Sequence, residues 1–425
     1  MTDNGSPTLP AAQPGSALTT SAVLRYQGVR TLMTSSALLY GGVALQAAAL
    51  FKQAYDISGN EADLGWIGLC EFLPAAAFVL ITGQLADRVN RRVMALVAIG
   101  IELLATVALV LYALSEPTKV WPLFVIAFAY GVGRAFAAPA LRSMPPMVAP
   151  EGALPKVIAL YSATWTGASI IGPAVSGLLY AVHPAAAYGT SGLLVAVAMV
   201  TLGRVQFLRQ PDRVPASQRP TFRSAIEGLV FIRRTPVLLA AISLDLFAVL
   251  FGGAVALLPA IAEERLGTGD IGYGFLRSAP GIGAAIMAVA LAARPVSRRV
   301  GRTLLWAVAV FGLGTVVLGL TRSYAVAFAA LVVLSAADMV SVFIRGSIVP
   351  LVTPDDKRGR VLAVENVFIG ASNELGAFES GMVAQAVGTP ATVVGGGIAT
   401  VVIVGVFWVA FPPLRNVDRF DDLGT

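Results

Sequence analysis

The feature that most constrains this sequence is a series of twelve apolar stretches separated by short polar segments. An α-helix of about 20 apolar residues spans the hydrocarbon core of a bilayer, which is about 30 Å thick. Inside lipid the backbone must satisfy its own hydrogen bonds, and the ten-residue alternation of barrel strands is missing here. The stretches cover residues 29–51, 63–86, 93–115, 120–141, 157–181, 186–204, 236–261, 270–293, 303–321, 323–347, 360–387 and 390–411. The sequence therefore predicts an all-α membrane protein with twelve transmembrane helices.

The composition supports a lipid-exposed surface and narrows the chemistry. Only 13% of the residues are charged, whereas a soluble protein has roughly a quarter. Cys70 and His183 are each the single residue of their kind, so neither a disulfide within the chain nor a Cys or His metal site can be built. The sequence also has no G-x-x-x-x-G-K-[ST] phosphate loop. We expect no enzyme activity, no metal and no cofactor.

The positive charges follow the predicted topology. With the N-terminus inside, the inner segments contain 25 of the 30 lysines and arginines, which is the positive-inside pattern. This bias explains the basic character without nucleic acid and predicts that both termini are cytoplasmic. The predicted units are a disordered cytoplasmic tail (1–24), a six-helix bundle (25–204), a cytoplasmic linker (205–235), a second six-helix bundle (236–411) and a cytoplasmic tail (412–425). Within the linker, residues 221–234 have the pattern of an amphipathic helix at the membrane surface.

An internal repeat relates the two predicted bundles. A shift of 204 residues places the segment 146–150 (PMVAP) on the segment 350–354 (PLVTP). The same shift aligns Gly172 with Gly376. Because six helices separate the copies, both halves cross the membrane in the same direction and form parallel repeats.

The loop after the second predicted helix reads GQLADRVNRR from Gly83 to Arg92. It resembles the signature loop of the major facilitator superfamily, in which Gly83 would allow close helix packing. The resemblance places Asp87 at the N-terminal end of the eleventh helix, where a carboxylate is stabilised by the helix dipole. Arg88, Arg91 and Arg92 would complete a charge network that holds the cytoplasmic side closed.

The fifth predicted helix resembles the exporter signature of the same superfamily, G-x-x-x-G-P-x-x-G-G. The matching residues are Gly167, Gly172, Pro173 and Gly177. Small residues let helices approach closely and proline bends a helix, so ordinary packing is the alternative interpretation. Over residues 25–411 the chain is most similar to bacterial exporters of the enterobactin and Tap multidrug type.

Two acidic residues are the first candidates for proton coupling. Placing a charge at the bilayer centre costs at least ~2.5 kcal/mol of insertion free energy, so a charged residue there indicates a functional or structural role. The resemblance implies that the first, fourth, seventh and tenth helices line a central cavity. Asp245 and Asp338 lie within the seventh and tenth helices and would face it. Desolvation favours the neutral form of a carboxyl group, so either can exchange a proton near neutral pH. The alternative is a structural hydrogen bond to a neighbouring helix.

A second group of charged residues has a functional and a structural interpretation of equal weight. Its members are Glu71, Arg277, Glu374, Glu379 and Arg134. Glu71 and Arg277 are expected to pair across the two halves and seal the outer side, or to contact substrate. Arg345 is expected to snorkel to the inner interface, and Glu102 to be buried and protonated. Aromatic residues that can line a lipophilic pocket are Trp66, Phe72, Trp165, Phe247 and Phe368.

These patterns predict a proton-coupled exporter of amphipathic organic compounds, such as drugs or siderophore-like molecules, in a bacterial inner membrane. Its partners would be a small-molecule substrate, protons and the lipid bilayer, and we expect a functional monomer. An uptake symporter is the alternative within the same class. A membrane sensor or scaffold that does not transport is the alternative from another class.

Overall fold

The structure is a computed structural model that describes residues 19–209 and 222–423. The side chains of residues 79–81, 83, 84, 86–88 and 222–225 lie outside this description. The described residues form helices and contain no strand. The long helices of the first half are α2 (Gln27–Ser58), α3 (Glu61–Arg88), α4 (Arg91–Leu114), α5 (Trp121–Arg142), α7 (Leu154–Tyr180) and α8 (Pro184–Gly203). Those of the second half are α10 (Pro236–Phe251), α12 (Asp270–Ala293), α13 (Val300–Leu320), α14 (Tyr324–Val352), α15 (Asp355–Val387) and α16 (Thr389–Ala410).

Short elements connect or flank these helices. They are α1 (Thr20–Leu24), α6 (Pro145–Val148), α9 (Phe222–Arg234), η2 (Gly253–Val255), α11 (Leu258–Ala260), η3 (Ile261–Arg265), α17 (Pro412–Arg415) and η4 (Phe420–Leu423). Among the described residues, nine helical segments are long and apolar enough to cross a membrane, counting residues 236–265 as one. The other three long helices are α3, α7 and α15. Two helix pairs, α3 with α15 and α7 with α12, join the two halves, and each of these three helices therefore takes part in a contact between the halves.

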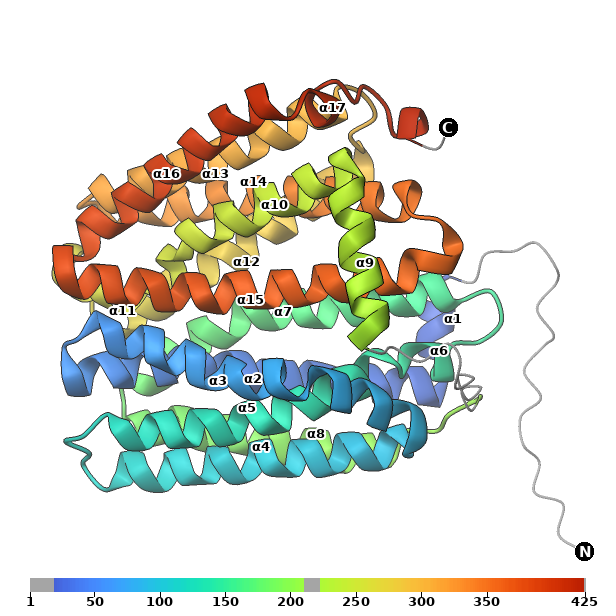
Figure 1. The fold of residues 1–425 in the computed structure, drawn as a ribbon. Helices are drawn as coiled ribbons and strands as arrows, with labels where there is room; N and C mark the ends of the chain where they lie inside the picture. Colours follow the sequence, from blue (N-terminus) through green and yellow to red (C-terminus); the bar gives the residue numbers. More distant parts are fainter. Residues whose placement is uncertain (1–18, 210–221, 424–425) are drawn as a thin grey trace, which may run out of the picture.

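The long helices run side by side and define two ends of the molecule (Figure 1). At one end lie α1, α6, α9 and α17, and we call this the linker end. At the other end short turns join successive helices, for example between Ser58 and Glu61 and between Val387 and Thr389. We call this the hairpin end.

The hydrophobic core shows that the halves meet at the hairpin end. One core cluster contains buried residues of both halves, from Leu45 and Leu64 to Leu331 and Ala377. The two clusters nearer the linker end do not mix the halves. One contains residues of the first half alone, and the other contains residues that follow the linker. The described part of the molecule is therefore sealed at the hairpin end and divided towards the linker end.

Glycines make the seal possible. A Cβ atom built on Gly274 of α12 would lie 2.7 Å from the Cα atom of Gly177 in α7. A Cβ atom on Gly381 of α15 would lie 3.1 Å from the Cα atom of Gly65 in α3. The first distance leaves no room for a side chain and the second is shorter than an ordinary Cβ contact, so the backbones approach closely because these residues have no side chain.

The seventh crossing is broken near its hairpin end. The α-helix stops at Phe251 and the chain continues through η2, α11 and the π-helical η3. A Cβ atom on Gly253 would lie 2.4 Å from the carbonyl oxygen of Gly376, so this segment is pressed against α15. Interrupted helices leave backbone carbonyls that need donors. The Val255 carbonyl accepts a hydrogen bond of 3.3 Å from Arg277 Nη1.

The predicted helix positions agree with the structure to within a few residues, with two informative differences. The first crossing continues to Ser58, so Lys52 belongs to a helix and not to a loop. The predicted disorder of residues 1–24 is wrong for residues 20–24, which form α1 with Val23 fully buried. Residues 1–18 lie outside the described residues. The predicted amphipathic helix is present as α9.

Candidate functional site

A buried ion pair joins α10 and α14 in the second half. Arg345 Nη2 lies 2.7 Å from Asp245 Oδ1, and the two side chains are only 5% and 7% exposed. Arg345 Nε also donates to Ser341 Oγ, 3.4 Å away and one helical turn earlier. The expectation that Arg345 snorkels to the interface is therefore wrong. A buried partner charge holds it inside the protein, because an unpaired charge there is costly.

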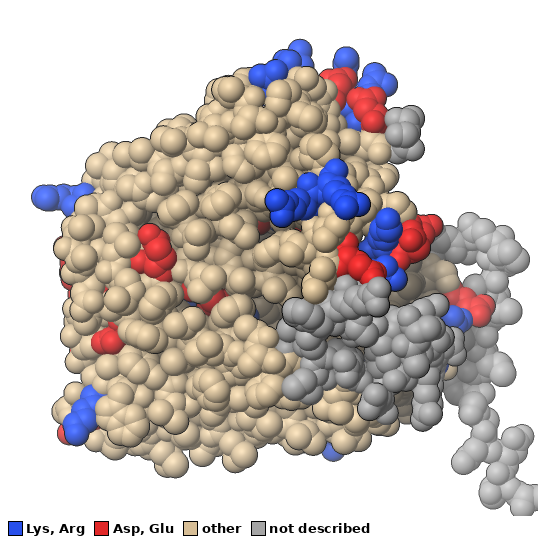
Figure 2. Space-filling view, in the orientation of Figure 1, with Lys and Arg blue, Asp and Glu red and all other residues tan. Residues whose placement is uncertain are grey.

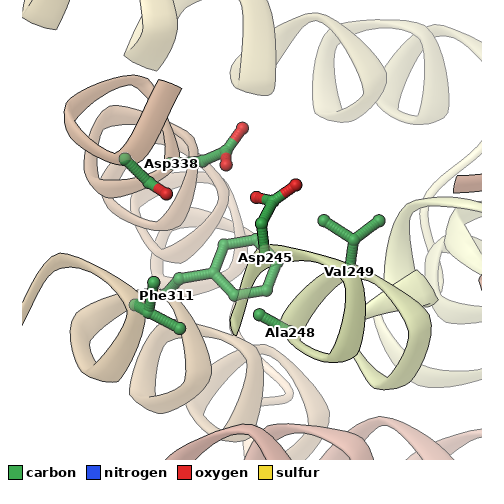
Figure 3. A pocket seen from close by; sticks show the side chains of 7 residues that line it. Asp245, Ala248, Val249, Phe311 and Asp338 are labelled. Carbon is green, nitrogen blue, oxygen red and sulfur yellow. The ribbon is translucent and has the colours of Figure 1, made fainter. Parts of the chain in front are cut away.

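Asp338 lies beside this pair. Both aspartates line a small cavity of ≈ 10 Å³ (Figure 3), which is room for about one water molecule. Asp338 accepts no hydrogen bond and forms no ion pair with any described residue, but it interacts electrostatically with Arg345 and Asp245. The buried Glu365 of α15 also interacts electrostatically with Arg345 and Asp245. The site thus holds three carboxyl groups and one guanidinium, so an acid without a direct partner, such as Asp338, is suited to carry a proton.

A second ion pair lies within the first half. Arg134 Nη1 of α5 is 3.3 Å from Glu71 Oε2 of α3, and the Glu71 side chain is 8% exposed. The Arg134 side chain is 47% exposed although it lies well inside the helix. The exposed apolar residues Trp121, Val125 and Phe128 mark the lipid face of α5. Arg134 lies on the opposite face at 3.6 residues per turn, so its exposed part points away from the lipid face of α5.

The structure brings charges from both halves near this pair. Glu374 of α15 interacts electrostatically with Glu71, Arg134 and Arg277. Its Oε2 atom would lie 3.1 Å from a Cβ atom on Gly68 of α3, so it points at the first half. Glu71 therefore does not pair across the halves as predicted but within its own half, and Glu374 is the acid that crosses the interface.

Arg277 of α12 also reaches the other half. Its guanidinium lies over the ring of Phe51 of α2, 4.9 Å from the centroid. A cation over an aromatic face is attracted by the ring quadrupole. Arg277 thus links the broken seventh crossing, through the Val255 carbonyl, to the first helix of the first half.

The two remaining acids take different places. Glu102 of α4 is 3% exposed and packs against α5, because a Cβ atom on Gly133 would lie 2.8 Å from its Cγ atom. Among the described residues its carboxyl group has no hydrogen-bond partner, but it interacts electrostatically with Arg134 and Glu71. Glu379 contacts Ser380 Oγ at 3.5 Å and does not join the cluster.

An aromatic group lies between α2 and α7. The hydroxyl groups of Tyr40 and Tyr161 share a hydrogen bond, and Trp165 packs edge-on against Tyr40 with centroids 5.2 Å apart. Trp165 is 52% exposed, and the lipid-facing residue Ile171 is 62% exposed. These two residues point in different directions on α7, since Trp165 shares the stripe that contacts α2. Its exposed surface therefore lies on a different side of α7 from Ile171.

A polar contact between the halves at the hairpin end was not predicted from the sequence. Lys52 of α2, 8% exposed, contacts Asp56 on the next turn, Glu263 Oε2 at 3.4 Å and Asp270 Oδ1 at 3.3 Å. Glu263 and Asp270 belong to the second half, so these four residues, which we call the Lys52 latch, close the hairpin end. Hydropathy alone ended the first crossing at residue 51, which placed Lys52 in solvent.

Tyrosines extend the latch. Tyr180 of α7 donates a hydrogen bond of 2.6 Å to Asp56 Oδ2. Tyr55 of α2 donates to Glu264. Tyr273 of α12 donates to the Ala48 carbonyl at 3.0 Å. Four helical segments therefore hold the hairpin end together.

Replacing Lys52 by glutamine is expected to open the hairpin end. Each lost pair with a partly exposed carboxylate costs up to about 1 kcal/mol, so the loss of two cross-half pairs shifts the closed-to-open ratio by up to roughly thirty-fold. Electron-spin distances between labels on Lys119→Cys and Arg322→Cys, two loop positions of opposite halves at this end, should lengthen. The control Glu116→Gln should leave them unchanged. An unaltered distance distribution in Lys52→Gln would contradict the latch.

The predicted signature loop is only partly described. The side chains of Gly83, Asp87 and Arg88 lie outside the described residues. Arg92 donates a hydrogen bond of 3.3 Å to the Gly203 carbonyl and another to the Val205 carbonyl. It ties this loop to the end of α8. Arg91 lines a pocket at the linker end.

The predicted exporter signature lies where two interfaces meet. A Cβ atom on Gly172 would be 2.6 Å from Ala44 Cβ of α2, and the Pro173 carbonyl packs against Gly274 of α12. Gly177 makes the backbone contact with Gly274 described above. A Cβ atom on Gly167 would meet nothing within 4 Å, so this glycine is not needed for close packing here.

Comparison with known sequences gives one family and several relatives. The family model described as Major Facilitator Superfamily matches residues 32–346. Macrolide efflux protein A of Streptococcus pyogenes is 29% identical over 225 residues, which are 52% of this chain and 55% of that protein. The chain thus spans about half the length of this relative. Multidrug efflux pump Tap of Mycolicibacterium fortuitum is 25% identical over 379 residues, 85% of this chain and 90% of that protein.

Solved structures of transporters share the fold. A mutant form of the nucleoside transporter NupG has a TM-score of 0.71 at 11% identity, covering 90% of this chain and all of that chain. A bacterial homologue of the lysosomal transporter Spinster has a TM-score of 0.68 at 14% identity, covering 94% and 97%. At such identities the likeness shows the fold alone.

Proposed function

Since this chain belongs to the Major Facilitator Superfamily, we propose that it is a proton-coupled exporter of amphipathic organic compounds that works by alternating access. Fold and family are those of membrane transporters, and the named relatives are efflux proteins. The proposal concerns three properties, namely the coupling ion, the direction of transport and the substrate class.

The observation that carries proton coupling is the group of Asp245, Asp338 and Arg345, in which Asp245 and Arg345 are buried and Asp338 is partly buried. A single guanidinium cannot neutralise both of these carboxylates and the buried Glu365 that also interacts with it, so at least one carboxyl group is best kept neutral by a proton. Asp338 is the better candidate because Asp245 already holds Arg345 at 2.7 Å. Uptake of a proton by Asp338 raises the charge of the second half by one unit, and release of that proton on the other side of the membrane lowers it again.

The charge distribution supports an orientation with the linker end in the cytoplasm. In that orientation the Lys52 latch and the glycine contacts close the outer side, and the space between the halves opens inward. Substrate would then enter from the cytoplasm or the inner leaflet. The same orientation assigns the outer gate to α2, α7, α12 and the broken seventh crossing, with α3 and α15 closing the other flank.

The chemistry of the inner space supports an amphipathic substrate. Trp165, Tyr40 and Tyr161 offer an aromatic wall on the first half, and Glu374 and Arg134 offer charges at the boundary of the halves. A lipophilic body can stack on such a wall while its polar group meets the charges. Each proton that re-enters contributes about 2.3 kcal/mol per 100 mV of membrane potential.

Transport in proteoliposomes with an imposed pH gradient tests the proposal. With a panel of lipophilic dyes, macrolides and siderophores, we expect gradient-driven flux for wild type and for the control Glu116→Gln. Flux through Asp338→Asn should fall to the level of protein-free liposomes, because the amide cannot take up a proton. Substrate-induced proton release should vanish in the same variant.

Three outcomes would contradict the proposal. Full gradient-driven flux in both Asp338→Asn and Asp245→Asn would exclude these acids as proton carriers. Accumulation that follows protons into the liposome would indicate the uptake symporter. A panel without any flux, together with normal substrate binding, would favour a sensor.

A further inference from the structure

Within residues 19–209 and 226–423, helix α9 has one face that no other element covers. Ile226, Leu229 and Val230 are 46%, 45% and 41% exposed. Together with Arg233 they occupy positions i, i+3, i+4 and i+7 of one helical stripe. Arg233 and Arg234 are exposed at the C-terminal end of the helix. An apolar stripe that ends in two cations is therefore open to the surroundings.

The opposite face of α9 is fixed to the second half. Glu227 Oε2 lies 2.7 Å from Arg360 Nη1 of α15. A Cβ atom on Gly228 would be 2.8 Å from the Arg360 carbonyl oxygen. The Lys357 ammonium lies 5.1 Å from the ring centroid of Phe231, and Ile232 is 2% exposed. The helix is thus held in one orientation, and the exposed stripe is a property of the folded chain.

The position of α9 suits a membrane surface. It runs across the long helices and not along them, at the perimeter of the linker end (Figure 1). Its contact Arg360 is five residues from the start of α15, or about 7 Å along the axis, which is the depth of the interfacial region and not of the hydrocarbon centre. Figure 2 shows basic side chains gathered towards the linker end, beside a largely uncharged surface.

We infer that α9 is a docking surface for anionic phospholipid headgroups of the leaflet at the linker end. The guanidinium groups of Arg233 and Arg234 match phosphate oxygens in charge and geometry. Ile226, Leu229 and Val230 enter the boundary between headgroups and acyl chains, as the apolar faces of interfacial helices do. Because the Glu227–Arg360 ion pair joins α9 to α15, lipid bound here fixes the linker end of α15 relative to the leaflet.

A lipid titration tests the arginines. Phosphatidylglycerol is added to the full-length protein in neutral detergent, and bound lipid is counted by native mass spectrometry. Each arginine near a membrane surface contributes about 1 kcal/mol, which is a five-fold effect, so Arg233→Gln/Arg234→Gln should weaken the affinity roughly thirty-fold. The control Arg294→Gln/Arg302→Gln removes two exposed arginines at the same end and should bind as wild type. Equal affinity of all three proteins would overturn the inference.

The depth at which α9 lies in the membrane tests whether its apolar stripe contacts lipid. A nitroxide on Leu229→Cys in a Cys70→Ser background reports accessibility to oxygen and to a polar nickel complex in nanodiscs. We expect preferential oxygen access with phosphatidylglycerol and loss of that preference in phosphatidylcholine alone or in the Arg233→Gln/Arg234→Gln variant. A label shielded from both reagents would show that protein covers the stripe, and a lipid-independent signal would show that charge plays no part. Either result overturns the inference, and neither readout depends on transport.

Discussion

Arg345→Gln is expected to lower the free energy of unfolding by about 3–5 kcal/mol and to abolish transport, because it leaves Asp245 buried without its partner. The pair is enclosed, with side chains 5% and 7% exposed, so bulk water does not solvate Asp245 when the guanidinium is removed. Removing one charged partner of such a pair lowers the stability more than removing both partners does. Thermal unfolding in detergent and gradient-driven flux measure the two effects separately.

A double variant separates stability from function. Asp245→Asn/Arg345→Gln removes both charges and should recover most of the lost stability, because an amide pair needs no counter-charge. Flux should stay absent, since the group around Asp338 then lacks the cation that balances its ionised form. An Arg345→Gln protein that unfolds at the wild-type temperature, or a double variant that transports, would show that this ion pair is not the coupling element.

Gly274→Val should prevent closure of the hairpin end. Its Cβ atom would lie 2.6 Å from the Pro173 carbonyl oxygen and 2.7 Å from the Gly177 Cα atom. Both are backbone atoms that no rotamer change can move, so closure requires the helices to separate. Overpacking of this kind costs about 1–3 kcal/mol, which changes the closed-to-open ratio by roughly five- to a hundred-fold.

Cysteine labelling from the hairpin side measures this change. In a Cys70→Ser background, Ala48→Cys lies fully buried under Tyr273 at the boundary of the halves. An impermeant maleimide should label it faster in Gly274→Val than in wild type. Gly189→Val is the matched control, because a Cβ atom there meets nothing within 4 Å. Equal labelling rates in all three proteins would show that the α7–α12 contact does not form the seal.

The latch and the glycine contacts act at the same end but by different physics. The Lys52 latch is electrostatic and weakens gradually when one partner is lost, whereas the contact between Gly177 and Gly274 is steric and fails with one added side chain. Lys52→Gln should therefore leave a mixture of closed and open molecules. Gly274→Val should leave predominantly open ones, and the two measurements above distinguish these results.

Several site residues could be found from the sequence because a charge inside an apolar stretch is conspicuous. Asp245, Asp338, Glu71 and Arg134 were identified in this way, and the structure places them in two ion-paired groups. The ion-pair partners of these residues could not be predicted from the sequence. Arg345 was assigned to the interface because its position in the helix allows snorkelling, and only the packing of α10 against α14 shows that it is enclosed with Asp245.

The sequence by itself determined the number, order and approximate ends of the membrane helices, because lipid imposes a length and a polarity on every crossing. It also determined the twofold repeat. The tertiary structure alone decided which charges meet and which end is closed. Those properties depend on the contact of residues far apart in the chain, such as Lys52 with Asp270 and Gly177 with Gly274. The hydropathy of a segment describes its preference for lipid or water. It contains no information about which other segments that segment contacts.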